Sequence, residues 1–404
     1  MPSVHRELTL RNKPFTQKSI RLRNDPPHPM TQQSSRSLRI AITGSRGIPN
    51  NYGGFEQFAE RISTILVRRG HRVTVYNPHF HPYSSEEFEG VRIVKCYSPE
   101  KTIGAAGNFV YDYLCMRHAL REKCDILLVL GYTTSSIFNP ILPRGKSIMV
   151  TNVDGLEWKR DKWNGFTKFI IRRLEALGAR FGGHLVSDNR EIRNYLLRTY
   201  DKDSTCIAYG ADIPGPTKTA LLKPYGVQPR EFDMLIARLE KENNIETILD
   251  GISANPGQTP FLVIGNHGHA YGEFLKKKYA NVQRIRFTGG IYDINVLNSL
   301  RGLCRFYFHG HSVGGTNPSL LEAMASGALI VSHDNPFNRD VLGENAFYFG
   351  SSDDIVRLLT DERNMETSRE SMTRLQREKI VSDYSWEGIT RQYESLFLDL
   401  TANQ

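Results

Sequence analysis

The sequence contains few cysteines, no long apolar run and no apolar leader. Five cysteines are scattered through 404 residues without a CxxC pair, which argues against a disulfide framework or a zinc site and favours a reducing compartment. No run of about 18 apolar residues is present to span a membrane, and the N-terminus lacks the apolar segment of a secretory signal. These absences predict a cytoplasmic protein.

Positive charge is in excess. The net charge is +9 and the pI is about 9.2, which favours an anionic partner: a nucleic acid, an anionic lipid or a phosphorylated substrate. A solvated basic surface is the alternative. Residues 1–37 carry seven Lys and Arg with Pro and Ser and no sustained periodicity. We expect them to form a basic, disordered arm.

From Leu38 the chain alternates between strand and helix patterns. The apolar run Leu38–Thr43 predicts a buried parallel strand. The apolar spacing from Phe55 to Leu66 predicts a helix that ends at Gly70, and Arg72–Tyr76 reads as the next strand. Further segments continue the alternation to about residue 208: strands at 125–130, 147–150, 184–187 and 205–208, and a helix at 166–181.

The segment Ile213-Pro-Gly-Pro216 interrupts this pattern, and a second series follows it. Strands are predicted at 232–237, 261–264, 284–288, 304–308 and 329–332, with helices beginning near 320 and 385. The expected architecture is α/β, with two doubly wound, Rossmann-like halves at 38–215 and 216–384 and a terminal helix at 385–404 that returns to the first half. Since ligands bind beyond the carboxyl ends of such strands, the two halves should face each other across a cleft.

A glycine-rich loop, GSRGIPNNYGGFE, joins the first strand to the first helix. Glycines let backbone N–H groups approach a ligand, and a helix N-terminus favours an anion such as phosphate. The loop matches neither GxGxxG nor GxxxxGK[ST], which weakens a dinucleotide or ATP interpretation. An ordinary strand–helix turn is the alternative.

A second such loop spans residues 310–322. Asn317 suits a helix N-cap and Pro318 the first helical position. The carboxylate of Glu322 lies within the first turns, where it either faces the cleft or only complements the helix dipole.

Two charged residues follow predicted strands. Arg238 comes just beyond a strand, where a cation can meet a pyrophosphate, or is a plain surface arginine. Asp154 follows a strand of the first half and could orient or deprotonate an acceptor hydroxyl, or form an Asp-Gly turn.

Aromatic and basic residues alternate between 158 and 181. Trp158 and Trp163 lie among cations, and the helix that follows combines an apolar stripe with Lys and Arg. Aromatics beside cations suit a membrane interface, whereas a stripe packed on the sheet is the competing interpretation for the helix.

Taken in order, GSRGIPNNYGGFE, NVDGLEWKRDKW, ARLEKENNI and HSVGGTNPSLLEAMASG resemble glycosyltransferase family 4, and within it the bacterial surface-polysaccharide rhamnosyltransferases. The resemblance covers nearly all of residues 38–402. It implies the GT-B fold and retaining sugar transfer without a metal or other cofactor. The implied donor is dTDP-L-rhamnose, and the implied acceptor is a lipid-linked saccharide at the inner face of the membrane.

The resemblance also implies roles for individual residues. Gly53 and Gly54 would meet the donor phosphate, Arg238 would bind pyrophosphate, Glu322 would hold the nucleotide ribose and Asp154 would lie near the acceptor. Asp154, Arg238 and Glu322 are the predicted catalytic residues. The predicted donor site further includes Gly47, Lys241, Gly290, His311, Gly315, Thr316 and Asn317, and the predicted acceptor site further includes Glu56 and Trp158.

The sequence departs from the wider family at two positions. A Glu usually precedes Glu322 by eight residues, and here that position is Gly314; the Lys usually found after the strand-end Arg appears as Glu242, although Lys241 is adjacent. The rhamnosyl subgroup shares both departures. A 6-deoxy sugar offers fewer hydroxyls, so we interpret the departures as a donor signature.

Other functions remain open on the sequence. A GT-B enzyme could use a UDP- or GDP-sugar, and a nucleotide-sugar epimerase would convert the donor without an acceptor. A basic nucleic-acid-binding protein would need one face of Lys and Arg with stacking aromatics. The cation-rich stretches here are short and dispersed, so no nucleic-acid partner is expected, and lipid phosphates explain the charge more simply.

Overall fold

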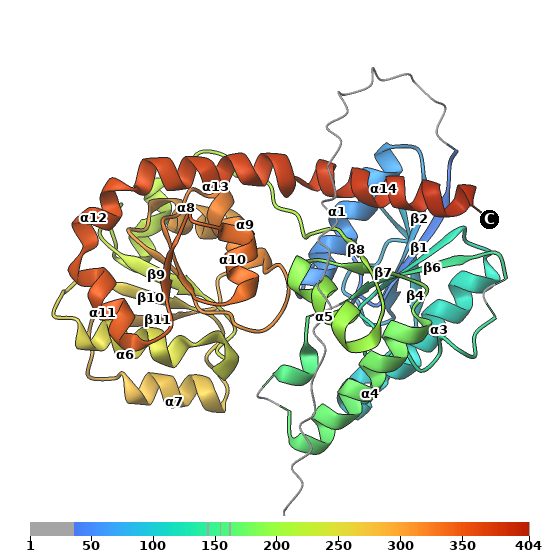
Figure 1. Ribbon diagram of the computed structural model, residues 1–404, viewed down its shortest axis with the longest axis horizontal. Helices are drawn as coiled ribbons and strands as arrows, with labels where there is room; N and C mark the ends of the chain where they lie inside the picture. Colours follow the sequence, from blue (N-terminus) through green and yellow to red (C-terminus); the bar gives the residue numbers. More distant parts are fainter. Residues whose placement is uncertain (1–35, 144, 154, 161–162, 404) are drawn as a thin grey trace, which may run out of the picture. The chain divides into compact units, whose positions relative to one another are not determined.

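The computed structural model describes residues 36–143, 145–153, 155–160 and 163–403. Almost all of the predicted basic arm, together with Asp154, lies outside the described residues. Within them the chain forms two sheets, each flanked by helices (Figure 1). The 213–216 segment falls between the last strand of one sheet and the first strand of the other.

The first sheet has the strand order β3-β4-β2-β1-β5-β6-β7-β8 in the described chain. All neighbours are parallel except β3 and β4. Its strands are β1 (Arg39–Thr43), β2 (Arg72–Pro78), β3 (Glu87–Phe88), β4 (Val91–Cys96), β5 (Ile126–Leu130), β6 (Ile148–Val153), β7 (His184–Ser187) and β8 (Thr205–Cys206). The helices of this half are α1 (Gly54–Arg68), α2 (Glu100–Ile103), η1 (Gly104–Ala106), α3 (Gly107–Arg121), η2 (Glu157–Lys159), α4 (Gly165–Phe181) and α5 (Arg190–Tyr200).

The second sheet has the order β11-β10-β9-β12-β13-β14, and its paired strands are parallel. Its strands are β9 (Asp233–Ile236), β10 (Phe261–Ile264), β11 (Ile285–Gly289), β12 (Tyr307–His309), β13 (Ile330–His333) and β14 (Phe347–Phe349). The helices are η3 (Thr219–Tyr225), η4 (Lys241–Asn243), α6 (Ile245–Ala254), α7 (Ala270–Lys278), α8 (Ile294–Leu303), α9 (Pro318–Ala325), α10 (Pro336–Leu342), α11 (Ser352–Thr360), α12 (Glu362–Thr367), α13 (Arg369–Asp383) and α14 (Trp386–Ala402).

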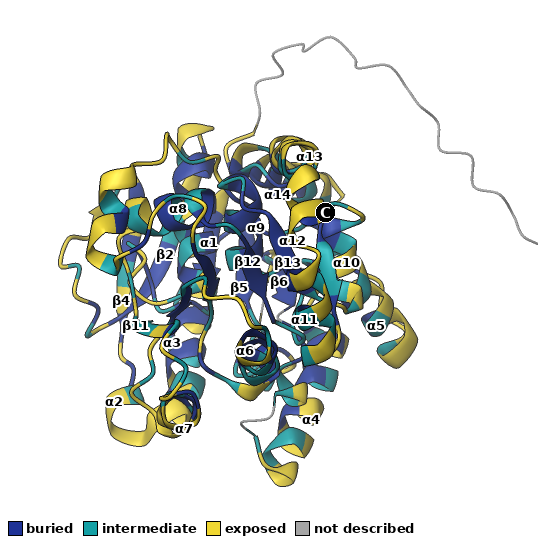
Figure 2. Ribbon diagram, turned by 90° about the vertical axis from the view of Figure 1, so that its left-hand side faces the viewer, coloured by how far each residue is buried: buried dark blue, intermediate teal, exposed yellow. Residues whose placement is uncertain are grey.

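The strands are buried because helices cover both faces of each parallel sheet. In Figure 2 the strands form the dark interior and the helices are exposed on their outer sides. The central strands β5 and β10 are buried at every position. Helix α1 presents Phe58, Ile62 and Leu66 to the core and Arg61 and Arg68 to solvent. The predicted α/β class with two doubly wound parallel sheets is confirmed.

The terminal helix α14 packs on elements of the first half, as Figure 1 shows. Trp386 lies 6.1 Å from the Phe58 ring of α1 and 5.0 Å from the Tyr209 ring, between ring centroids. The Tyr393 hydroxyl accepts a hydrogen bond of 2.7 Å from the Asn152 amide at the end of β6. Glu394 forms an ion pair with Arg69 and a 2.9 Å hydrogen bond with His71 Nε2. The end of the chain is therefore anchored beside the β1–α1 unit.

Both sheets reverse direction at one pair of neighbouring strands. In the first sheet the chain winds outward from β1 through β2 to β4 and then from β5 the other way. In the second sheet it winds from β9 through β10 to β11 and then from β12 the other way. Ligands of open α/β sheets bind at such switch points, beyond the carboxyl ends of the strands. The loops after β1, β9 and β12 therefore occupy the expected ligand positions.

Candidate functional site

The loop after β1 is shaped by close backbone contacts. Gly44 has a φ of +87°, and a Cβ there would lie 2.2 Å from the Leu130 carbonyl oxygen, so a side chain cannot be accommodated. Gly47 has a φ of +91° and packs against Asn77, whose side chain bonds both the N–H and the C=O of Ile48 at 3.0 and 2.7 Å. Gly47, a predicted donor residue, is thus buried in contacts that fix the loop.

The loop leads into an N-terminus of α1 that no side chain caps. Gly53 is the N-cap, and it makes no side-chain cap hydrogen bond. The Glu56 carboxylate is turned back to accept a 2.7 Å hydrogen bond from the Arg46 N–H, and the Tyr209 hydroxyl donates to the Gly54 carbonyl oxygen. The first N–H groups of the helix are therefore available to an anion. Glu56, predicted near the acceptor, orders the loop instead of standing free.

Helix α9 meets α1 at this point. A Cβ on Gly54 would lie 3.6 Å from Cγ of Pro318, the first residue of α9. The Asn317 side chain caps α9 by accepting from the Ser319 N–H at 3.0 Å, as predicted. The Gln57 amide of α1 donates to Glu322 Oε1 at 3.4 Å. Two helix N-termini, one from each half, thus converge on one place.

The carboxylate of Glu322 is held in position by Arg301. Its Oε2 pairs with the guanidinium of Arg301, a side chain of α8 that is itself 2% exposed. The Glu322 side chain remains 22% exposed, with Oε1 on the side of α1. A buried cation on one carboxylate oxygen fixes its orientation and leaves the other oxygen to accept hydrogen bonds.

The loop after β12 is fastened to the first half by Asp188, which follows β7. The Thr316 N–H donates to Asp188 Oδ2 at 3.0 Å, and the Thr316 hydroxyl donates to the Asp188 carbonyl oxygen at 2.5 Å. A Cβ on Gly315 would lie 1.8 Å from Asp188 Oδ1. Gly315 and Thr316, both predicted donor residues, therefore also connect the halves.

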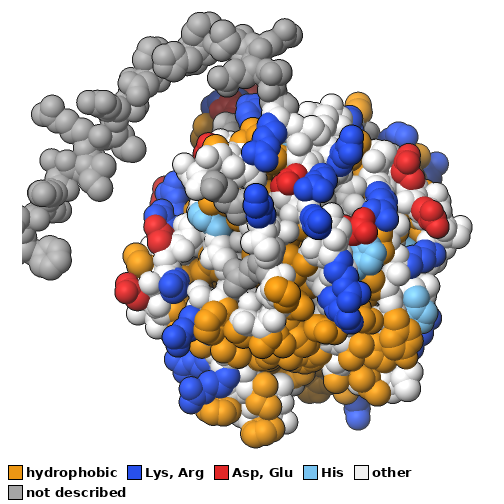
Figure 3. Space-filling model, turned by 90° about the vertical axis from the view of Figure 1, so that its right-hand side faces the viewer, with side chains coloured by type: hydrophobic (Ala, Val, Ile, Leu, Met, Phe, Trp, Pro, Cys, Tyr) orange, Lys and Arg blue, Asp and Glu red, His pale blue; other side chains and the backbone are white. Residues whose placement is uncertain are grey.

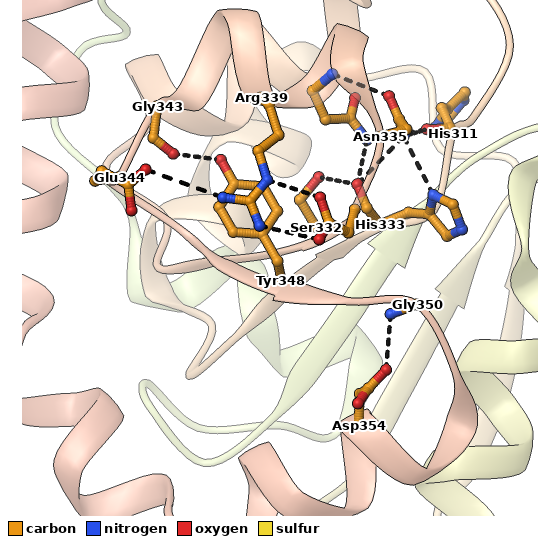
Figure 4. A network of polar contacts seen from close by, with 12 residues as sticks. His311, Ser332, His333, Asn335, Arg339, Gly343, Glu344, Tyr348, Gly350 and Asp354 are labelled. Carbon is orange, nitrogen blue, oxygen red and sulfur yellow. Dashed lines mark hydrogen bonds and ion pairs between the residues drawn. The ribbon is translucent and has the colours of Figure 1, made fainter.

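His311 begins this loop and is fixed by the second half. Its carbonyl oxygen accepts hydrogen bonds from Asn335 at 3.1 Å and Asn338 at 3.0 Å (Figure 4). Its ring stacks on His309 with 4.6 Å between centroids. Burial lowers the pKa of His311 to about 3, and the charges of Arg238 and Arg160 act in the same direction. The imidazole is therefore neutral at physiological pH and offers a hydrogen bond but no charge.

The segment after β9 presents two cations. The side chains of Arg238 and Lys241 are exposed, and neither has an ion-pair partner among the described residues. Glu242 points into the protein: burial raises the pKa of its carboxyl, and its carbonyl oxygen accepts from Ser312 Oγ at 2.8 Å. The charge of Arg238 acts on His311 of the β12 loop.

The segment after β6 contributes aromatic and basic side chains. Trp158 lies beneath the guanidinium of Arg172, 5.0 Å from the ring centroid, and Trp163 donates to Glu157 at 3.1 Å. Arg160 pairs with Glu157 at 2.5 Å and with Glu240 of the second half at 3.7 Å. Trp158, predicted near the acceptor, therefore lies beside the α4 surface.

The geometry brings together part of the predicted site. Contacts link Gly54 with Pro318 and Gln57 with Glu322, and the charge of Arg238 acts on His311. No contact places Lys241 or Gly290 in this cluster within the described chain, and Asp154 lies outside the described residues. The sequence analysis missed Gln57, Asp188 and Arg301, which act across elements. Of these three residues, only Asp188 could have been found from the sequence, because it directly follows a strand.

Two protein families match the chain. Residues 38–212 match a domain of unknown function (DUF1972), and residues 227–379 match the glycosyl transferases group 1. The second half is therefore similar to the glycosyl transferases group 1. No curated protein matches the chain.

Solved structures share the fold over nearly the whole chain. Sucrose-phosphate synthase from Thermosynechococcus elongatus has a TM-score of 0.72 at 16% identity, covering 91% of this chain and 100% of that one. Anabaena HepE in complex with UDP and glucose gives 0.68 at 14% identity, covering 90% and 100%. WaaG, a glycosyltransferase involved in lipopolysaccharide biosynthesis, gives 0.66 at 12% identity, covering 89% and 99%. The fold is GT-B.

Proposed function

We propose that this chain is a retaining glycosyltransferase of family 4 that moves a sugar from a nucleotide-sugar to a saccharide acceptor. The observation that carries the proposal is the meeting of the uncapped α1 N-terminus with the Thr316–Glu322 segment, at the switch points of both sheets. The group 1 domain and the likeness to HepE, whose structure holds UDP and glucose, support a nucleotide-sugar donor.

Each group of donor residues is proposed to bind a different part of the nucleotide-sugar. The N–H groups of Gly54 and its neighbours and the guanidinium of Arg238 would receive the pyrophosphate, because both present donors and positive charge without an internal partner for that charge. Glu322, fixed by Arg301, would accept hydrogen bonds from the ribose hydroxyls. The donor sugar proposed from the resemblance is L-rhamnose, carried by dTDP.

The reaction needs positioning and charge stabilisation. An acceptor hydroxyl attacks the anomeric carbon on the face from which the phosphate leaves; the carbon–phosphate oxygen bond breaks as the glycosidic bond forms. The leaving phosphate oxygen takes the hydroxyl proton. Arg238 and the α1 N–H groups stabilise the negative charge that develops on the diphosphate. Asp154 is assigned to orient the acceptor, a role that stays a prediction.

The acceptor is proposed to be a lipid-linked saccharide of bacterial surface polysaccharide synthesis, reached at an anionic membrane surface. Helix α4 supports a membrane contact because its first turns expose Phe166 (74%), Phe169 (54%) and Ile170 (40%) beside exposed arginines. Figure 3 shows a broad apolar area on one face of the protein with Lys and Arg around it. None of the described helices is long and apolar enough to cross a bilayer.

The proposal is tested by nucleotide binding. Thermal shifts are recorded with dTDP-L-rhamnose, UDP-glucose and GDP-mannose, and the largest shift is expected with the dTDP-sugar. Arg238→Ala should weaken that binding about 10- to 100-fold, since a hydrogen bond to a charged group contributes about 1.5–3 kcal/mol. Arg374→Ala is the matched control, because that exposed arginine of α13 pairs only locally with Glu378.

Each alternative gives a different result. Preference for a UDP- or GDP-sugar would overturn the rhamnosyl assignment and leave the proposed transferase in place. Conversion of the donor sugar with no acceptor present would identify an epimerase. Absence of a shift with all three nucleotide-sugars would contradict the proposed function as a whole.

A further inference from the structure

A cavity lies beside the glycine loop, and two of its lining residues, Arg46 and Tyr52, directly precede the predicted donor residues Gly47 and Gly53. Its volume is about 390 Å³, within the range of small-molecule sites. The side chains that define it are Arg46, Tyr52, Phe80, His81, Glu100 and Lys101. None of them belongs to the site predicted from the sequence, and the donor chemistry described above uses none of them.

The cavity occupies a ligand position of the first sheet. Its lining comes from segments after β1, β2 and β4, which are neighbours in the sheet and end at the same edge. Tyr52 directly precedes Gly53, the N-cap of α1, so the two Cα atoms lie about 3.8 Å apart. A sugar attached to a phosphate at the α1 N-terminus therefore has this cavity as its immediate neighbour.

The lining combines aromatic rings with fixed polar groups. Tyr52 is 68% exposed and carries the Arg46 guanidinium over one ring face at 3.8 Å from its centroid. Glu100 fixes that guanidinium, with Arg46 Nε donating to it at 3.2 Å. Phe80 lies beneath the Lys101 ammonium at 4.5 Å. Rings held by charged neighbours offer stable apolar surfaces, and the polar groups are set around them.

His81 adds a buried, neutral ring to the wall of the cavity. Its side chain is buried, at 6% exposure, and its Nδ1 accepts from the Tyr83 N–H at 3.2 Å. Burial lowers the pKa of the imidazole, so the ring is neutral and its proton lies on Nε2. With the Glu100 carboxylate as acceptor and the Arg46 guanidinium as donor, the cavity presents both kinds of hydrogen-bonding group.

This chemistry fits a sugar ring better than an anion. The charge of Arg46 is already matched by Glu100, and a carboxylate in the lining repels phosphate. A pyranose has an apolar C–H face that packs on aromatic rings and hydroxyl groups that both donate and accept.

We infer that this cavity binds the terminal hexopyranose of the acceptor saccharide, next to the donor site. The inference rests on the proposed glycosyl transfer and names residues that select its acceptor. Tyr52 and Phe80 provide the stacking surfaces, and Glu100 and Arg46 bond the ring hydroxyls. The acceptor hydroxyl is thereby brought to the side of α1 at which the donor phosphate departs.

Saturation-transfer NMR tests the inference with three probes: methyl α-D-glucopyranoside, methyl α-D-galactopyranoside and methyl N-acetyl-β-D-glucosaminide. The wild-type protein should transfer saturation to at least one of them. Tyr52→Ala and Phe80→Ala should each reduce that signal at least fivefold. Tyr52→Phe, which keeps the ring, and Phe274→Ala, which removes an exposed ring of α7, should retain most of it.

The outcomes separate this inference from the proposed function. Equal signals from the wild type and both alanine variants, or no transfer to any probe, would overturn the acceptor cavity. The dTDP-L-rhamnose thermal shift of the same variants reads the donor site independently and should stay within a few degrees of wild type. Saccharide binding that depends on Tyr52, without any nucleotide-sugar binding, would instead contradict the transferase proposal alone.

Discussion

Asp112 of α3 is a buried carboxyl outside both proposed sites. Its side chain accepts a hydrogen bond from the Thr134 hydroxyl, and the residue is 5% exposed. Burial raises the pKa of Asp112 from 3.8 to about 6 against the opposing effect of that hydrogen bond. The folded protein therefore binds this proton more tightly than the unfolded chain does, and the stability that results is full below about pH 4 and lost as pH rises through about 6.

Asp112→Asn should remove this pH dependence while keeping the shape of the side chain. A difference of about two pKa units corresponds to about 3 kcal/mol, so between pH 4 and pH 7 the variant should gain about that much unfolding free energy relative to wild type. Urea denaturation at both pH values measures it. Asp399→Asn, at an exposed carboxyl of α14, is the control and should leave the wild-type difference unchanged. An unaltered pH dependence in Asp112→Asn would show that this carboxyl is ionised in the folded protein.

Site residues that lie on one loop could be predicted, and those that act across elements could not. The side-chain chemistry of Asn317 and Pro318 predicts a helix start, and in the structure Asn317 is the N-cap of α9. Arg301 gives no such signal, because its importance comes only from the carboxylate that α9 brings beside it. Gly47 shows the reverse error, in which a sequence pattern predicts a ligand contact that the fold does not leave open. The side chain of Asn77, distant in sequence, occupies the space next to Gly47.

Among the elements, helix α3 departs most clearly from the amphipathic pattern by which a helix is predicted. Its buried positions include Tyr111, Asp112 and Cys115, so polar residues interrupt the apolar stripe and no helix was predicted there. Strand β12 was expected at 304–308 and is found at 307–309. The shift arises because Cys304 caps α8 by donating to Leu300, and Phe306 bonds the Asp233 side chain. Hydrogen-bond partners distant from the strand pattern thus set boundaries that periodicity alone cannot locate.

Helix α4 divides its apolar stripe between two environments. Leu174, in the middle of the helix, is buried, as a stripe packed on the sheet requires, whereas Phe166, Phe169 and Ile170 of the first turns are exposed. Arg173 lies over the Phe169 ring at 4.9 Å. The later turns therefore pack on the fold, as one interpretation requires, whereas the first turns expose aromatics beside cations, and the membrane contact stays a prediction.

Replacement of both exposed rings, Phe166→Ser with Phe169→Ser, should abolish the proposed membrane contact without disturbing the core. Burial of one Phe contributes roughly 1.5–3 kcal/mol, so the partition coefficient onto vesicles should fall at least tenfold. Co-sedimentation with vesicles of phosphatidylglycerol and phosphatidylcholine measures it. The control is Phe274→Ser with Ile294→Ser, which removes two exposed apolar side chains of the second half. Equal loss in both double variants would assign binding to general hydrophobicity, and no loss in either would remove α4 from the interface.

At the scale of the molecule, the candidate site depends on contacts between the two halves. Gln57 reaches Glu322, Arg160 reaches Glu240, and Asp188 holds Thr316. The Asp188 contact is the most tightly packed of these, because its carboxylate occupies the place that a side chain at position 315 would need. The loop that carries His311 to Asn317 is therefore ordered partly by the half to which it does not belong.

A double-mutant cycle on Asp188 and Gly315 tests this dependence. Asp188→Ala removes the acceptor of the buried Thr316 N–H, which costs about 1–3 kcal/mol, so hydrogen exchange of the 310–317 segment should accelerate about 5- to 100-fold. Gly315→Ala should accelerate it too, because the new Cβ would displace the carboxylate. In the double variant the clash disappears, so the effects should fall short of additivity by about 0.5–3 kcal/mol. Gly165→Ala, where no atom lies within 4 Å of a new Cβ, should change neither background. Strict additivity would mean that the two residues act separately, and no acceleration in Asp188→Ala would mean that the 310–317 loop is ordered by the second half alone.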